Sequence, residues 1–333
     1  MIDAAGSSLP PPGGPAPWRR RVGDPFYRML TLLASLTIFA IILYIAGTLV
    51  AQSLPTIRAY GFRFVTGSVW DEVQDRYGVL PYIFGTVYSS LIALLFAVPI
   101  SLGAAIFLSE MAPRWIRTPV TFLIELLAAI PSVVYGLWGI FLLLPWLRDH
   151  VMQPLANSSA PRIPVIGALF RGYAVGPSML AAGVILAIMI IPFITAVSRD
   201  ILRAIPRAQR EASYAMGANQ WETIRHVVVP YARSGIIGAV VLGLGRALGE
   251  TMAVTMVIGN QTPQTPSGVS FALFDPGYTM ASALANKFTE AQPGLNTAAL
   301  VEVGLVLFCL AILVNIVARL LVYYTASNLQ GGR

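Results

Sequence analysis

Six apolar stretches, each about 20 residues or longer, constrain the fold of this chain more than any other feature of its sequence. They lie at about 29–52, 81–109, 119–147, 177–197, 235–259 and 296–322. An α-helix rises 1.5 Å per residue, so about 20 apolar residues cross the roughly 30 Å hydrocarbon core of a bilayer. Prolines inside such stretches are tolerated because packed neighbouring helices can bond the freed backbone groups. The sequence therefore predicts an all-α membrane protein with six transmembrane helices.

The composition agrees with this prediction and excludes a soluble globule. Of the 333 residues, 56% are hydrophobic and 11% are charged, whereas soluble domains average about 25% charged residues. The first apolar stretch is longer than the 7–15 residues of a signal-peptide core, so we expect it to be retained as a helix. Residues 1–24, rich in Pro, Gly and Arg, are expected to form a disordered cytoplasmic tail, and residues 25–325 to form the transmembrane domain.

The arginines predict the orientation in the membrane. The two ends of the chain and the loops 110–118 and 198–234 hold 14 of the 21 arginines, and the three intervening loops hold six arginines and Lys287. Because Lys and Arg gather in cytoplasmic loops, both termini are expected in the cytoplasm. The net charge of +7 is then a sign of topology, and nucleic acid is not expected as a partner.

No catalytic, metal or cofactor site is expected in this chain. A phosphate-binding Walker A loop needs G-x-x-x-x-G-K-[ST], but Lys287, the only lysine, stands between Asn286 and Phe288. Two histidines and the single Cys309 are too few for a zinc site, a disulfide framework or an iron–sulfur cluster. If ATP drives this protein, another subunit hydrolyses it.

The loop 198–234 contains the most specific motif. It reads Glu211-Ala212-Ser213, three residues, Gly217, nine residues, then Val227-x-Val229-Pro230. This resembles the EAA loop of ABC-type importer permeases, E-A-A-x3-G-x9-I-x-L-P, with replacements of similar size. The resemblance implies the ABC importer type I permease fold and a coupling loop, residues 206–230, that docks on a cytoplasmic ATPase.

The residue types in this loop suit a docking elbow. Ala212 and Ser213 give a helix a smooth face, and Gly217 can end or bend that helix and permit close backbone approach. The candidate coupling residues are Glu211, Ala212, Ser213, Gly217 and Pro230. The alternative is an ordinary solvated basic loop.

The fifth apolar stretch contains two charged residues. Arg246 lies about a dozen residues into it, where an arginine costs about 2.5–3.5 kcal/mol on insertion scales and should face a partner or water. Glu250, four residues on, is expected on the same helical face. Either the two neutralise each other and stabilise the bundle, or Arg246 lines a pathway and binds an anion through its planar fork of donors, with Glu250 orienting it and limiting how tightly the anion is held. Gly245 and Gly249 predict close helix packing.

Two runs resemble the permeases of phosphate-specific transport systems, and in particular their PstC type. They are Gly-Arg-Ala-Leu-Gly-Glu-Thr-Met-Ala-Val at 245–254 and Pro-Ser-Val-Val-Tyr-Gly-Leu-Trp-Gly at 131–139, and the resemblance covers about residues 25–325. It implies a plasma (inner) membrane permease, not itself an enzyme, that forms half of the channel of an ATP-driven phosphate importer. Arg246 and Glu250 would then be needed for phosphate passage. The implied partners are a second related permease (PstA type), a dimer of ATPase subunits and an external phosphate-binding protein.

Three alternatives stay open on the sequence. A permease for another oxyanion, such as phosphonate, molybdate or sulfate, would share the coupling loop and differ in its binding protein. An ion-coupled secondary transporter would need no ATPase, so vesicles without ATP would still accumulate substrate. A sensor of phosphate status would lose signalling while uptake stayed intact.

Overall fold

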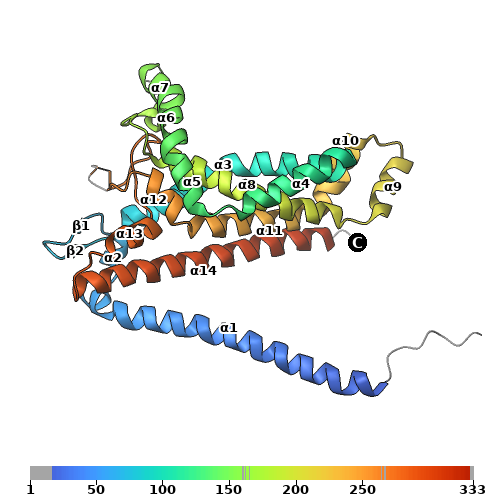
Figure 1. Ribbon diagram of the computed structural model, residues 1–333, viewed down its shortest axis with the longest axis horizontal. Helices are drawn as coiled ribbons and strands as arrows, with labels where there is room; N and C mark the ends of the chain where they lie inside the picture. Colours follow the sequence, from blue (N-terminus) through green and yellow to red (C-terminus); the bar gives the residue numbers. More distant parts are fainter. Residues whose placement is uncertain are drawn as a thin grey trace, which may run out of the picture. The chain divides into compact units, whose positions relative to one another are not determined.

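A computed structural model describes residues 17–330 apart from 160, 162, 165, 264, 266 and 267 (Figure 1). The described chain is helical except for its loops and one two-stranded hairpin. It divides after Ala51 into two units. Most of the expected tail, residues 1–16, lies outside the described residues.

The first unit is the N-terminal part of α1 (Pro17–Tyr60). This helix begins at Pro17, earlier than the end of the tail expected through residue 24. Proline is favoured at the first position of a helix because its φ angle is already helical and its missing N–H would be unbonded there. Residues 25–45 are exposed all round the helix. An apolar helix with no polar face is typical of a membrane span.

The second unit contains the other elements. In chain order they are α2 (Arg63–Thr66), β1 (Trp70–Asp71), β2 (Arg76–Tyr77), α3 (Leu80–Ile106), the π-helical η1 (Phe107–Met111), α4 (Arg114–Ala129), α5 (Ser132–Trp138), the π-helical η2 (Gly139–Leu143), α6 (Leu144–Leu147), the π-helical η3 (Arg148–Met152), α7 (Gln153–Asn157), the 3-10 segment η5 (Ile166–Phe170), α8 (Met179–Arg203), α9 (Arg207–Ala215), α10 (Gln220–Thr223), the π-helical η6 (Ile224–Val228), α11 (Val229–Leu248), α12 (Met252–Val257), α13 (Met280–Lys287) and α14 (Leu295–Gln330).

Five helices among the described residues are long and apolar enough to cross a membrane. They are Pro25–Tyr60, Leu80–Met111, Met179–Arg203, Gln220–Leu248 and Leu295–Tyr324. The segment Gln220–Leu248 runs without interruption through α10, η6 and α11. The expected span 119–147 is not straight, and its two halves form the sixth candidate span only if they are counted together.

The break in that segment lies at Ile130 and Pro131. The helices Arg114–Ala129 and Ser132–Asn157 meet there at an angle of 92°. Proline has no N–H and its ring clashes with the preceding turn, so it breaks a helix. The Tyr135 hydroxyl donates to the carbonyl of Leu127 at 2.9 Å and so bonds a carbonyl at the end of α4. The expected span 119–147 therefore consists of two helices that meet at this break.

The core forms around α8, the most buried of the long helices. It packs against α3, α4 and α11. Small residues permit this close approach: a Cβ on Gly183 would collide with Ile92 of α3, and one on Gly243 of α11 would collide with Ile194 of α8. These contacts position α11, which carries Arg246, against the centre of the unit.

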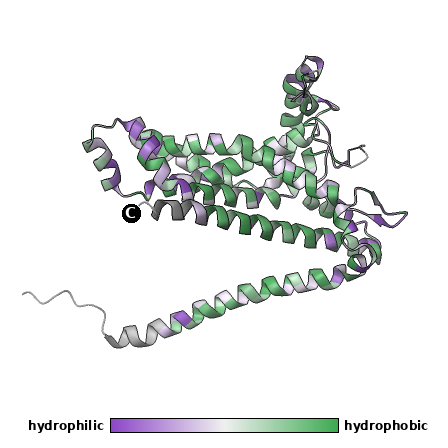
Figure 2. Cartoon of the chain, turned by 180° about the vertical axis from the view of Figure 1, so that it is seen from behind, coloured by the Kyte–Doolittle hydropathy of each residue, from purple (hydrophilic) through white to green (hydrophobic). Residues whose placement is uncertain are grey.

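Polar residues gather at the two ends of the second unit. In Figure 1, α9 and α10 lie at one end, and the β1–β2 hairpin, α2 and α13 lie at the other. Figure 2 shows hydrophobic residues along the helices between them and hydrophilic residues at both ends. The hairpin pairs Trp70 with Tyr77 and Asp71 with Arg76 in antiparallel register. This distribution is expected when the middle of a protein lies in hydrocarbon and its ends lie in water.

Candidate functional site

The helix that carries Arg246 ends two residues after it. α11 stops at Leu248 with Gly249 as its C-cap, and α12 begins at Met252. The expected continuous span 235–259 is therefore broken, and Glu250 leaves the helical face of Arg246. The Glu250 carboxylate accepts a hydrogen bond of 3.4 Å from the backbone N–H of Ala253 in the first turn of α12. Glycine is a poor helix former and favours such an end.

Arg246 makes no hydrogen bond or ion pair within the part of the chain that the structure describes. Its side chain is exposed in the last turn of α11. No ion pair joins it to Glu250, which is half-buried, so the prediction of a pair on one helical face is wrong. The i, i+4 rule assumes an unbroken helix, and the break after Leu248 removes that condition.

The face of α11 that packs inside this chain is opposite to the one predicted from Gly245 and Gly249. A Cβ on Gly245 would meet nothing within 4 Å, and one on Gly249 would meet only the carbonyl of Gly245. The close approach is made by Gly235, against Ile201, and by Gly243. Gly243 and Gly245 differ by about 200° around a helix of 3.6 residues per turn. Leu242, Gly245, Arg246 and Gly249 thus share the exposed face.

The two runs that carry the family resemblance meet in space. α5, from the run 131–139, packs against α12, from the run 245–254. A Cβ on Gly136 would lie 2.4 Å from the sulfur of Met256, and one on Gly139 would lie 2.7 Å from Val257. The buried Tyr135 of the same run lies within electrostatic range of the Arg246 guanidinium. Gly136 of α5 and Gly139 of η2 therefore hold α12 and the break close to the bend at Pro131.

The coupling loop forms a helical elbow at the end of the unit that carries α9 and α10. α9 ends at Ala215 and the chain turns at Gly217, whose φ of +89° favours glycine. Ser213 is buried, and its hydroxyl lies 3.0 Å from that of Thr223 in α10. α10 begins with a capping box formed by Asn219 and Glu222.

The outer surface of this elbow presents exposed side chains. Glu211, Ala212 and Gly217 are exposed, and so are the larger Met216 and Trp221, at 83% and 59%. Pro230 stands inside the continuous helix Gln220–Leu248, two residues after the end of the π-helical η6. An exposed aromatic and thioether surface on a short rigid elbow is suited to contact with another protein.

Glu110 anchors the coupling loop to the bundle, which the sequence does not indicate. Its carboxylate accepts two hydrogen bonds from Arg210 of α9, at 3.1 and 2.8 Å, and its backbone carbonyl accepts one from Gln220 of α10 at 2.9 Å. Arg210 also donates to the carbonyls of Leu202 and Ile205. The side chains of Arg210 and Glu110 are 17% and 10% exposed. Since 100 residues separate the two, no local pattern could have found this pair.

No group of three His, Cys, Asp or Glu side chains that could hold a metal ion occurs among the described residues. The candidate site has two parts. One is Arg246 at the break between α11 and α12, and the other is the α9–α10 elbow, which the Arg210–Glu110 ion pair holds to the same bundle.

Comparison with known proteins places the chain in a family. Residues 97–328 match the description "binding-protein-dependent transport system inner membrane component", which covers more than half of the chain. The chain belongs to this family. As a binding-protein-dependent transport component it is a membrane-embedded transport subunit and not itself an enzyme.

The relatives and the solved structures agree with this membership. The phosphate transport system permease protein PstC of Haemophilus influenzae is 44% identical, over 90% of this chain and 93% of that protein. PstC 2 of Mycobacterium tuberculosis is 38% identical, over 90% of this chain and 91% of its own length. A bacterial ABC transporter for alginate import has a chain with a TM-score of 0.56 at 16% identity, covering 91% of this chain and 99% of that one. The MetNI methionine transporter gives 0.53 at 20% identity, covering 74% and 95%. The fold is that of ABC importer type I permeases, which confirms the predicted fold class.

Proposed function

We propose that this transport component is one permease subunit of an ATP-driven importer of inorganic phosphate in the plasma (inner) membrane. It forms half of the translocation pathway together with a second, related permease. The PstC relatives, named for phosphate transport, support the substrate. The single observation that carries the proposal is the exposed Arg246 guanidinium, which has no partner among the described residues and lies at the break between α11 and α12. A guanidinium offers a planar fork of donors that matches a tetrahedral oxyanion.

The proposed orientation puts both termini and the α9–α10 elbow in the cytoplasm. The excess of arginines in those segments supports it. A dimer of ATPase subunits then docks on the coupling loop through the surface around Gly217 and Trp221. An external phosphate-binding protein delivers phosphate at the opposite end, where the hairpin and α13 lie.

Transport requires two states of the bundle that expose Arg246 to opposite sides of the membrane. ATP binding and hydrolysis shift the balance between these states. Phosphate that binds Arg246 from one side of the membrane is then released to the other side. Glu250 has two parts in this proposal. Its carboxylate oxygen fixes the start of α12 through Ala253, and its negative charge near the break limits how tightly the anion is held.

The test measures phosphate uptake beside membrane levels of the complex, in cells without other phosphate importers. Arg246→Ala should lower uptake by at least about tenfold, because hydrogen bonds to charged groups are worth roughly 1.5–3 kcal/mol. Arg246→Lys should also be impaired, since it keeps the charge and loses the fork. Arg319→Ala, which removes an exposed arginine of α14, is the matched control and should transport normally.

Two further variants separate the roles of Arg246 and Glu250. Glu250→Gln keeps an acceptor oxygen for Ala253 and removes the charge, so it should assemble fully and alter only transport. A double change to leucine at both positions should assemble and fail to transport. Normal uptake by that double variant at normal complex levels would refute the role of Arg246.

A further inference from the structure

We propose that this chain binds a phosphate-type oxyanion at a second site, a cavity of about 420 Å³ between the β1–β2 hairpin, the start of α3 and α13. Its volume lies within the usual range for small-ligand pockets, about 300–1,000 Å³. The inference rests on the proposed function, because this end of the bundle faces outward only in the orientation proposed above. It adds a receiving site for the anion ahead of Arg246.

Three aromatic rings from separate segments build one wall of the cavity. Trp70 comes from β1, Tyr82 from the first turn of α3 and Tyr278 from the segment before α13. The ring centroids of Trp70 and Tyr82 are 5.4 Å apart, and those of Tyr82 and Tyr278 are 5.1 Å apart. Aromatic rings at these distances attract one another, and this packing restricts the rotamers of each side chain. The wall therefore fixes the positions of the two tyrosines.

Besides Asn260, whose amide nitrogen already donates to the carbonyl of Thr255, the cavity is lined by hydrogen-bond donors that the fold does not use. Tyr82 is 1% exposed, yet its hydroxyl makes no hydrogen bond within the described part of the chain. The Tyr278 oxygen accepts a hydrogen bond from Asn286 at 3.2 Å, which leaves its hydroxyl hydrogen to donate. Gln261 and Thr262 are exposed at the rim. Tyr82 lines the cavity, so its hydroxyl is available to donate to an oxyanion.

Lys287, the only lysine of the chain, supplies the positive charge. Its ammonium donates to the Glu72 carboxylate at 2.8 Å and lies 5.9 Å from the centroid of the Trp70 ring. An ammonium has three N–H donors, so two remain for a ligand. The hydrogen bond from Lys287 holds the pKa of Glu72 below its usual value, so Glu72 is ionised at neutral pH. The anion therefore competes with a carboxylate for Lys287, and binding stays weak enough for release.

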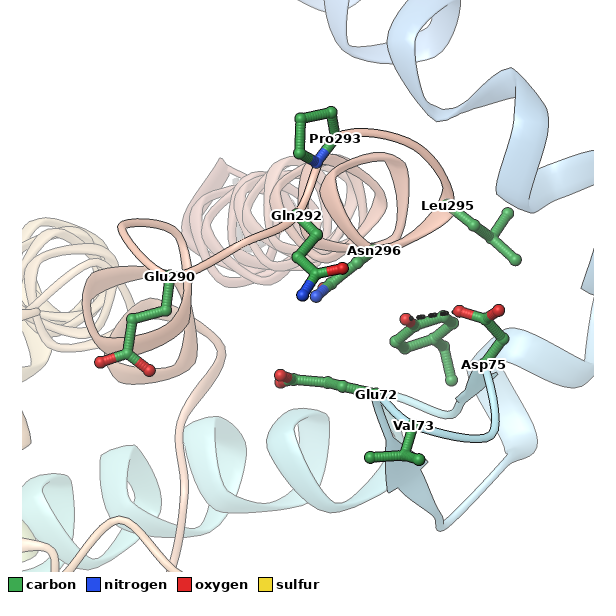
Figure 3. A pocket seen from close by; sticks show the side chains of 9 residues that line it. Glu72, Val73, Asp75, Glu290, Gln292, Pro293, Leu295 and Asn296 are labelled. Atoms are coloured by element: carbon green, nitrogen blue, oxygen red, sulfur yellow. Dashed lines mark hydrogen bonds between the residues drawn. The ribbon is translucent and has the colours of Figure 1, made fainter.

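The neighbouring cavity has the opposite charge and excludes an anion. It measures about 590 Å³ and is lined by Glu72, Asp75 and Glu290 together with neutral residues. Figure 3 shows these side chains around the space between the hairpin and the segment that leads into α14. Of these two cavities, the one beside Lys287 combines a cation with neutral donors, so charge directs the anion to it.

The cavity and Arg246 lie at the two ends of α12. The break after Leu248 precedes this helix, and Gln261 follows it by four residues. A helix of six residues spans about 9 Å. An anion received beside Lys287 is thus a short distance along the chain from the break at which we propose that Arg246 binds it.

The test titrates inorganic phosphate into the purified full chain in a maltoside detergent, which contains no phosphate, and follows the ³¹P line width. Every variant also carries Arg246→Ala, so that the proposed pathway contact does not contribute. The Arg246→Ala chain should still bind phosphate saturably. Adding Lys287→Gln should weaken this binding about tenfold, the loss of one charge-assisted hydrogen bond. Tyr82→Phe removes only a hydroxyl and should weaken it about fivefold.

Two controls test specificity. Lys287→Arg keeps a cationic donor and should retain binding. Tyr88→Phe makes the same chemical change as Tyr82→Phe outside the cavity, where the Tyr88 hydroxyl donates to the carbonyl of Phe271, and should leave binding unchanged.

The inference and the proposed function fail by different results. Absence of saturable binding in the Arg246→Ala chain, or binding that neither Lys287→Gln nor Tyr82→Phe weakens, would overturn the second site. Failure of the wild-type complex to import phosphate would overturn the proposed function instead. Import by that complex with unaltered binding in both cavity variants would refute the second site alone.

Discussion

Arg210→Ala is expected to release the coupling loop from the bundle. Arg210 makes four hydrogen bonds in the structure, two with the carboxylate of Glu110 and two with the carbonyls of Leu202 and Ile205, at 2.7–3.1 Å. The change removes all four and leaves the Glu110 carboxylate, which is 10% exposed, without its cation. The other link between Glu110 and the loop is the hydrogen bond from Gln220.

The magnitude follows from this burial. Removing one partner of a buried ion pair costs about 3–5 kcal/mol. Because the Arg210 side chain is 17% exposed and water can reach the vacated site, we expect the lower value, about 3 kcal/mol. Each 1.4 kcal/mol is a factor of ten, so the equilibrium for opening of the loop should rise roughly 100-fold. Glu110→Gln keeps the shape and an acceptor oxygen and should cost about 1 kcal/mol, or roughly fivefold.

The assay is amide hydrogen exchange of residues 207–223 in the purified full chain, combined with uptake by the assembled complex. Faster exchange should be confined to this segment, and transport should fall while the membrane level of the chain stays normal. Arg207→Ala is the matched control, since Arg207 stands on the same helix, is exposed and makes no hydrogen bond among the described residues. If Arg210→Ala exchanges no faster than Arg207→Ala, the ion pair does not hold the loop and this reasoning is wrong.

Gly217→Val should abolish transport with the chain still inserted, because a β-branched residue is strained at a φ of +89° by roughly 1–3 kcal/mol; normal uptake and normal co-purification with the ATPase would contradict this. Gly136→Leu should lower the thermal stability of the purified chain, since overpacking against α12 costs about 1–3 kcal/mol. Gly103→Leu, at an open position, should not. Glu72 has a lowered pKa in the folded protein, so its contribution to hairpin stability is present above about pH 4.5 and is lost as the pH falls through the lowered value. Exchange of residues 70–77, corrected for intrinsic rates, should accelerate only below that pH, and acceleration already at pH 6 would refute the assignment.

The apolar length of the six stretches was enough to predict the fold class, since hydrocarbon thickness sets a minimum helix length that few soluble proteins imitate. It could not predict where helices break. A proline within a packed span is tolerated at some positions and breaks the helix at others: Pro99 and Pro192 stand inside continuous helices, whereas Pro131 stands at a bend of 92°. Bonding of the freed carbonyl does not decide the difference, because at the bend itself the carbonyl of Leu127 accepts a hydrogen bond from Tyr135.

The same limit applies to the candidate site. Arg246 could be singled out because a charge in an apolar stretch needs an explanation. The position of Glu250 relative to Arg246 could not be predicted correctly, because the sequence does not reveal that α11 ends at Leu248. The Arg210–Glu110 pair and the cavity beside Lys287 join residues about 100 and 200 positions apart, which only the tertiary fold brings together.

Because the helix from Gln220 to Leu248 is unbroken, a movement of the coupling loop is transmitted along it to Arg246. Gln220 is fixed to the carbonyl of Glu110 at one end, and Arg246 stands 26 residues away, about 39 Å along a helix with a rise of 1.5 Å per residue. A tilt of about 10° at the elbow therefore displaces the guanidinium by about 7 Å, more than one helical turn. A small rotation of α9 and α10 would therefore shift this charge sideways by several ångströms, within the plane of the membrane. The break after Leu248 lets α11 tilt in this way without dragging α12 and the segments packed against it.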